Sequence, residues 1–223
     1  MSFIYELFGQ ILYWIYSVIG NYGVSIILFT VLVRLLMIPL TKKQTDNTKK
    51  MQEIQPKLQE IQKKYANNKE KLNRELLKLY NEYDYKPTAG CLPLLIQLPI
   101  IYGLFRVLQQ PEVYVFPEGY NVVHNFLWIS DLAKPDPYYI LPILAAVFTY
   151  FSMNMTVAQN TSSDDTAAQT QKMMNMIMPF MIGWISLKFP AGLALYWVIT
   201  NLIQVVQQSI ILGKFSRNKE ASR

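Results

Sequence analysis

Long apolar blocks recur along the chain, at residues 22–40, 91–108, 138–156, 173–187 and 193–212. Nineteen helical residues, the length of the first block, rise about 28 Å, close to the hydrocarbon thickness of a bilayer. The fourth block is shorter, so a helix there would thin the bilayer locally or pack beside protein. The pattern predicts an all-α membrane protein with five transmembrane helices.

The segment before the first block, residues 1–21, is also apolar and aromatic, with Glu6 and Gln10 as interruptions. A signal peptide would need a basic start, which this segment lacks. A span here would run almost directly into the next one. We therefore expect an external amphipathic helix in the membrane interface, anchored by its aromatic side chains Tyr5, Tyr13, Trp14 and Tyr16.

Residues 41–89 form the one long polar stretch between spans. Apolar residues recur in it every three or four positions, in two runs: Met51, Ile54, Leu58, Ile61 and Tyr65, then Leu72, Leu76, Leu79 and Tyr83. This spacing is typical of two amphipathic helices, and the polar residues 66–69 between them predict a tight turn. The stretch is expected to be an antiparallel helical hairpin, whose first helix either begins at Pro56 or kinks there.

Basic residues indicate the orientation of the chain in the membrane. Twelve Lys and Arg lie in 41–89 and four in the tail 213–223, whereas residues 1–21 hold none. By the positive-inside rule the N-terminus lies outside, and the hairpin and the short basic tail lie in the cytoplasm. The net charge of +6 suits anionic headgroups or ribosomal RNA, and no pattern for sequence-specific nucleic-acid binding is present. Topology signalling alone is the simpler use of most of these lysines.

One charge interrupts the first block, Arg34. An arginine at that depth costs about 2.5–3.5 kcal/mol on insertion scales. It either reaches back to the interface near Lys42, about 12 Å away along the helix, or lies in a water-filled cavity as a functional group. None of the five blocks contains Asp or Glu to neutralise it. That absence favours an arginine that awaits an acidic group from another molecule.

Further polar residues occur at membrane depth in four of the blocks: Thr30, Gln97, Thr149, Ser152, Asn201 and Gln204. Thr30 precedes Arg34 by one helical turn and shares its face. If the polar faces converge, they form one cavity inside the bundle. The amides of the last block could instead bond helices together, and both alternatives stay open. Five methionines within 173–181 are typical either of an adaptable apolar binding surface or of a lipid-facing helix.

The sequence contains few residues that could form a catalytic site. The only histidine, His124, falls in the predicted external loop, and the only cysteine is Cys91. A serine hydrolase needs a base beside its nucleophile, and no phosphate-binding glycine loop or zinc-binding motif is present. We expect no enzymatic activity, no cofactor and no metal.

Several motifs, in order, resemble one family. They are Arg34 in the first span, the hairpin start MQEIQPK at 51–57, the run GCLPLLIQLPI at 90–100, and PAGLALYW at 190–197 followed by Asn201. Together they resemble the YidC/Oxa/Alb membrane protein insertases, over roughly residues 20–212. The chain resembles the short members, without a large extracytoplasmic domain.

The resemblance implies a five-span core around a hydrophilic groove that is open to cytoplasm and lipid and closed outside. Arg34 matches the groove arginine, Gln97 a polar residue of the second span, and Tyr196, Trp197 and Asn201 the fifth-span motif. The implied function is insertion of short polar tails and transmembrane segments into the bilayer without nucleotide hydrolysis.

The implied partners are nascent membrane proteins and lipid, with the ribosome and the Sec translocon as candidates. The resemblance further implies a monomer in the bacterial plasma membrane, with no small-molecule substrate. The rival hypotheses are a small transporter or channel that binds an anion at Arg34, and a scaffold with buried polar contacts.

Overall fold

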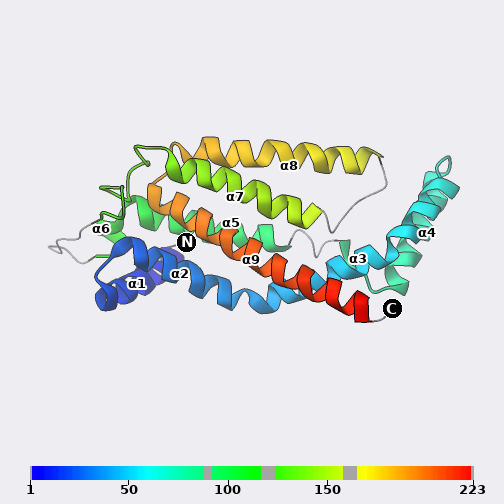
Figure 1. Ribbon diagram of the computed structural model, residues 1–223, viewed down its shortest axis with the longest axis horizontal. Helices are drawn as coiled ribbons and strands as arrows, with labels where there is room; N and C mark the ends of the chain where they lie inside the picture. The colour runs from blue at the N-terminus through cyan, green and yellow to red at the C-terminus, as the bar shows by residue number, and fades with distance from the viewer. Residues whose placement is uncertain (1, 88–91, 117–123, 158–164, 222–223) are drawn as a thin grey trace.

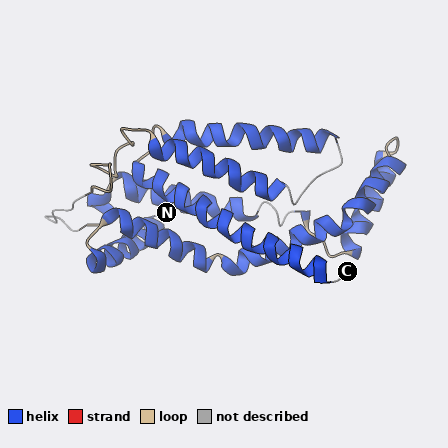
Figure 2. Ribbon diagram, viewed as in Figure 1, coloured by secondary structure: helices blue, strands red, loops and turns tan. Residues whose placement is uncertain are grey.

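The computed structural model describes residues 2–87, 92–116, 124–157 and 165–221. Regular structure in these ranges is helical, as predicted, apart from one isolated bridge between Phe126 and Ile129 (Figure 2). The helices are α1 (Ser2–Ile19), α2 (Tyr22–Leu36), α3 (Ile38–Lys64), α4 (Lys69–Glu82), α5 (Leu92–Gln109), α6 (Pro111–Tyr114), α7 (Ile140–Val157), α8 (Asp165–Ser186) and α9 (Ala191–Ala221).

The bundle is built around α9, which packs against α7, α2 and α5 (Figure 1). α8 covers the other side of α7, and α1 lies against α2 and α5. α4 projects from one end of the bundle, where it packs against α3, and the segments that join α5 to α7 lie at the opposite end. The core between these helices is apolar, with Leu12, Ile26, Phe29, Leu104 and Leu108 fully buried.

The described apolar segments differ in length. Among the described residues, only Ala191–Ile210 of α9 is long and apolar enough by itself to cross a bilayer, and α2 joined to the start of α3 makes a second such segment. The other apolar segments are Phe3–Ile19, Leu95–Gln109, Ile140–Met155 and Met173–Ser186. α5 as a whole, Leu92–Gln109, has 18 residues and rises about 27 Å, close to the 30 Å of a typical hydrocarbon core.

The first predicted span is not one straight helix. α2 ends at Leu36 and α3 begins at Ile38, and the two helices meet at an angle of 52° around Met37. Pro39 lies at the start of α3, where its ring fits the first helical turn but would clash with a helix continuing from Leu35. Pro56, by contrast, lies inside α3, so the helix neither begins there nor ends there.

Most of the α1 aromatic residues that were expected to anchor the helix in the interface face the rest of the protein. Tyr16 is buried, and Tyr5 contacts the rings of Tyr102 and Tyr114. Tyr13 also packs against the core, and only Trp14 has a mostly exposed side chain. Three of the four expected anchors thus pack at least partly against protein, and the location of α1 in the membrane interface stays a prediction.

α3 and α4 pack through a small apolar cluster of their own. Ile54, Leu58 and Leu79 are buried in it, and Met51, Ile61, Leu76 and Tyr83 line it. These side chains belong to the two predicted runs, although Tyr65 and Leu72 are not among them. α4 begins after Asn68, whose side chain accepts a hydrogen bond from the Lys71 amide at 3.0 Å. The predicted turn at 66–69 thus coincides with a capped helix start.

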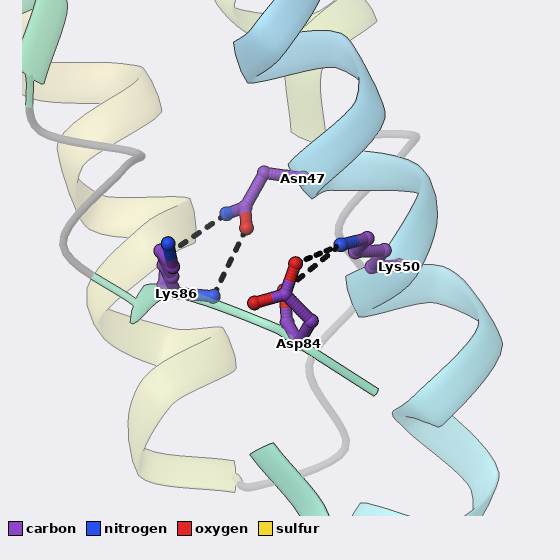
Figure 3. Close-up of polar contacts among 4 residues, drawn as sticks. All are labelled: Asn47, Lys50, Asp84 and Lys86. Atoms are coloured by element: carbon purple, nitrogen blue, oxygen red, sulfur yellow. Dashed lines mark hydrogen bonds and ion pairs between the residues drawn. The ribbon is translucent and has the colours of Figure 1, made fainter. Parts of the chain in front are cut away.

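Polar contacts fasten the segment that follows α4 to the first half of α3 (Figure 3). The Asn47 side chain donates to the carbonyl of Lys86 and accepts from its backbone amide, both at 3.0 Å. The Lys50 ammonium lies 2.9 Å from a carboxylate oxygen of Asp84 and holds the pKa of that carboxyl below its usual value. The chain turns at Asp84 with a positive φ of 46°. The hairpin is therefore closed at both ends, by its turn and by this pair of contacts.

Because of the α3–α4 cluster, two leucines of α4 should contribute differently to the stability of the hairpin. Leu79 is 4% exposed, whereas Leu77 is 62% exposed. We expect Leu79→Ala to destabilise the hairpin by about 2–5 kcal/mol, because it empties the centre of the seam. Leu77→Ala should change stability by less than about 0.5 kcal/mol. Hydrogen exchange of the α4 amides measures both, and equal protection in the two variants would show that the seam does not stabilise the hairpin.

Candidate functional site

The polar residues predicted in the last span follow one side of α9. Tyr196, Thr200 and Asn201 are buried there, and Gln204 is partly buried. Residues spaced by three or four positions on a helix share a face, so these groups form a polar stripe along an otherwise apolar helix. Before this stripe, α9 begins with the small residues Ala191 and Gly192, which lie close to the neighbouring elements. The stripe faces protein, because three neighbouring helices bond to it.

α5 and α7 each reach the stripe with one side-chain hydrogen bond. The Gln97 amide of α5 donates to the Tyr196 hydroxyl at 2.8 Å. The Trp197 indole donates to the Thr149 hydroxyl of α7 at 3.1 Å. Both bonds join residues far apart in the sequence, so they fix α5 and α7 relative to α9. They bring together four of the predicted site residues.

Arg34 of α2 approaches the stripe further along α9. Its Nη2 lies 3.5 Å from Oε1 of Gln204, a long and weak contact. The five ion pairs among the described residues do not include Arg34. A guanidinium has five N–H donors, so one weak contact leaves most of them to water or to a ligand. This partly buried cation is the least satisfied charged group that the sequence places at membrane depth.

Three other predicted residues are buried near these contacts. The Thr30 hydroxyl donates to the carbonyl of Ile26 in its own helix at 2.7 Å. Asn201 likewise donates to the carbonyl of Trp197, at 2.9 Å. Ser152 is buried on α7, one turn after Thr149. Thr30 and Asn201 therefore line the site. Each already donates one hydrogen bond to a carbonyl of its own helix.

Sequence reasoning missed one polar pair between α7 and α8. Asn175 is buried and donates to the side-chain oxygen of Asn154 at 3.3 Å. An amide inside the methionine-rich run was the available signal. The exposed face of α8 carries large apolar side chains: Met173, Met174, Met176, Ile177, Phe180, Met181 and Trp184. This exposure is compatible with both interpretations of the methionine cluster.

A separate hollow lies at the opposite end of the bundle from α4 and shares no residue with the polar site. It is lined by residues of the connection between α5 and α7: Glu112, His124, Asn125, Leu127, Trp128, Ile129, Ser130, Asp131 and Lys134. The His124 ring packs against Tyr22 and Phe116 with its Nδ1 buried, so this residue is not merely a surface histidine. Among the described residues, no group of acidic, histidine or cysteine side chains forms a metal site.

Apolar helices are joined by partly buried side-chain hydrogen bonds around a cation that has no carboxylate partner among the described residues. This arrangement is typical of an α-helical membrane protein with a polar interior site. The sequence model of the 60Kd inner membrane protein family matches residues 14–219. The chain therefore belongs to this family.

Curated relatives carry the names of insertases. A protein of Caldanaerobacter subterraneus named membrane protein insertase YidC is 42% identical over 212 residues, which is 95% of each chain. Membrane protein insertase MisCA of Bacillus subtilis is 39% identical and covers 86% of this chain and 71% of its own. The crystal structure of an active YidC insertase, with its first transmembrane domain resolved, superposes with a TM-score of 0.64 at 31% identity. The match covers 92% of this chain and 45% of that one.

The Gln97–Tyr196 hydrogen bond predicts a measurable coupling free energy between α5 and α9. In a double-mutant cycle, Gln97→Leu and Tyr196→Phe should show a coupling of about 0.6–1.7 kcal/mol, the range found for side-chain hydrogen bonds inside membrane proteins. Unfolding in detergent micelles measures the coupling. Gln97→Leu combined with Trp184→Phe, on the exposed face of α8, serves as the control and should be additive. Additivity in both cycles would mean that the hydrogen bond contributes nothing.

Proposed function

We propose that the chain is a membrane protein insertase that moves short polar tails and transmembrane segments from the cytoplasm into the bilayer through a hydrated groove. The observation that carries this proposal is Arg34, a partly buried cation whose described contact is one weak bond to Gln204. A cation held in this way within a membrane protein is suited to receive an anionic group from outside the fold. Membership of the insertase family supports the same reading.

The distribution of polar groups along α2 and α9 supports a groove that is open at one side. Tyr22, Ile26 and Phe29, in the first half of α2, are fully buried among apolar residues. Thr30 and Arg34 follow in the second half, towards the end from which α3 leads away. α9 repeats this order, from a buried apolar start to Asn201 and Gln204. The groove would therefore open towards the α3–α4 side and be closed at the other.

By the positive-inside rule, the α3–α4 side would lie in the cytoplasm and the N-terminus outside. Five spans follow, formed by α2 with the start of α3, then α5, α7, α8 and α9, while α1 lies in the outer interface. The apolar part of α8, Met173–Ser186, is too short for a full bilayer, so lipid around it would thin. A thinner bilayer shortens the apolar distance that a polar tail must cross.

Attraction at Arg34 would hold the incoming tail for a limited time. A carboxylate at about 4 Å gains roughly 4 kcal/mol at an effective dielectric constant near 20. Desolvation of the two charges opposes this gain by an amount of similar size. The small difference favours capture followed by release. Release into lipid is then driven by the transfer of the apolar segment out of water, so the cycle needs no nucleotide, cofactor or catalytic residue.

The remaining elements would guide the substrate. The α3–α4 hairpin lies at the cytoplasmic entrance, where it can meet the emerging chain. The exposed methionines and aromatic residues of α8 offer an adaptable surface to an incoming helix or to lipid. Exposed lysines of the hairpin and the short basic tail suit ribosomal RNA, and a Sec translocon is a further candidate partner. The chain would act as a monomer.

Replacement of Arg34 tests this proposal. In an insertase-depleted bacterium, Arg34→Ala and Arg34→Glu should lower insertion of a substrate with a short acidic tail by about 10–100-fold, the value of one charge-assisted hydrogen bond. Arg34→Lys should retain most insertion. Arg106→Gln, which changes the arginine in the last turn of α5, should leave insertion unchanged. Membrane levels of every variant are compared by quantitative blotting.

A second substrate separates charge recognition from a general defect. When the acidic residues of the tail are replaced by neutral ones, Arg34→Ala should insert it as well as the parent protein does. An equal loss for acidic and neutral tails would contradict a role of the Arg34 charge in capture. If the parent chain itself fails to support insertion, the transporter hypothesis takes precedence and anion flux becomes the next measurement.

A further inference from the structure

Residues 124–137, in the connection between α5 and α7, lie at the end of the bundle opposite α4 (Figure 1). We name residues 124–137 the outer cap. Its first part is a tight turn, in which Phe126 and Ile129 exchange backbone hydrogen bonds at 2.8 and 2.9 Å. Ile129 and Leu132 are buried in the main hydrophobic core. The outer cap therefore inserts apolar side chains into the bundle rather than lying loosely on it.

Backbone contacts attach the outer cap to the first turn of α9. The Ala191 amide donates to the carbonyl of Lys134 at 2.7 Å, and the Gly192 amide donates to the carbonyl of Leu132 at 2.9 Å. The first amides of a helix have no partner within the helix, so these bonds satisfy donors that would otherwise be buried without one. The cap is thereby fixed above α9.

A close contact attaches the cap to α2 as well. The Phe126 ring lies against Gly23, so closely that any side chain at position 23 would overlap it. Ile26 follows Gly23 by about one helical turn. Thr30 of the polar site follows Ile26 by about one more turn, on the same face of α2. The apolar layer between the outer cap and the polar site is therefore about two helical turns, or about 10 Å, deep along α2.

One buried carboxylate joins the outer cap to α7. Asp136 is 2% exposed. Its Oδ1 accepts hydrogen bonds from the Trp128 indole at 3.2 Å and from the Tyr138 amide at 3.1 Å, and its Oδ2 accepts from the Leu141 amide at 2.7 Å. None of the described ion pairs involves Asp136. Its negative charge is held by donors of the cap and by the N-terminal end of α7, where a helix favours an anion.

We propose that Asp136 is a positioning residue that locks the outer cap onto the start of α7 and so keeps the polar groove closed at its outer end. The proposal rests on the proposed insertase function, because it assumes a groove that is open to the cytoplasm. Trp128 is the cap-side partner of the lock, and the Leu141 amide is the helix-side partner. When the lock is lost, the Trp128 part of the cap is no longer held against the start of α7, and water from outside reaches the apolar layer above Thr30.

Accessibility of an introduced thiol tests the lock in the full-length protein. Cys91→Ser removes the only native cysteine, and Thr30→Cys then places a reporter below the apolar layer. Intact cells or right-side-out vesicles are treated with a membrane-impermeant sulfonated methanethiosulfonate. With Asp136 present, labelling of this reporter from outside should stay at background. Asp136→Asn should raise the labelling rate about tenfold or more, because it removes one charge-assisted acceptor, an effect equivalent to about 1.4 kcal/mol.

A carboxylate in the same loop supplies the matched control. Asp131 accepts from the Ala133 amide at 3.0 Å and pairs with Lys134, and its bonds stay within the cap. Asp131→Asn should therefore leave labelling at background. Trp128→Phe removes the cap-side donor and keeps the Asp136 contacts to α7, so it should increase labelling without loss of the α7 helix start. This second variant keeps the test decisive if Asp136→Asn fails to accumulate.

A second reporter distinguishes failure of this inference from failure of the proposed function. Gln204→Cys, in the Cys91→Ser background, should be labelled from the cytoplasmic side of inverted vesicles whether or not Asp136 is present. If Gln204→Cys is labelled but Asp136→Asn and Trp128→Phe leave Thr30→Cys at background from outside, the lock is refuted and the groove stands. If Gln204→Cys is not labelled from the cytoplasmic side, the groove itself is refuted.

Discussion

Hydrogen bonds between α9 and its neighbours are the interaction on which the bundle depends. An apolar environment offers no water to a buried polar group, so each unpaired group costs several kcal/mol. α9 carries a stripe of such groups, and α5 and α7 each pair with it through one side-chain bond, Gln97 to Tyr196 and Thr149 to Trp197. These pairs select one arrangement of helices that apolar packing alone would allow to rotate or slide.

Arg34 is the exception to this rule of pairing, and the exception points to function. Its contact to Gln204 is long, and no described carboxylate balances its charge. The stripe on α9 thus holds one cation of α2 beside Gln204, ready for an outside partner. The opposite end of the bundle is different in kind. There, backbone amides donate to carbonyls and to the Asp136 carboxylate around buried apolar side chains.

The fold could be predicted from the sequence wherever a structure depends on local spacing. Apolar residues every three or four positions indicated the helices and the α3–α4 seam, with Ile54, Leu58 and Leu79 at its centre. Local spacing did not indicate the bend at Met37, because an apolar run looks alike on both sides of it. Nor did it indicate which face of α1 meets protein, since Tyr16 and Trp14 are equally suited to a membrane interface and differ only in what packs against them.

For the site, the sequence by itself determined which polar groups lie at membrane depth and that no acidic residue in the same blocks balances Arg34. Only the tertiary structure decided which of them meet. Gln97 and Tyr196 are almost a hundred positions apart, and neither segment contains information about the rotation of the other. Asp136 passed unnoticed for the same reason: in the sequence it is one polar residue in a loop. Its role depends on three donors that only folding brings to a single carboxylate.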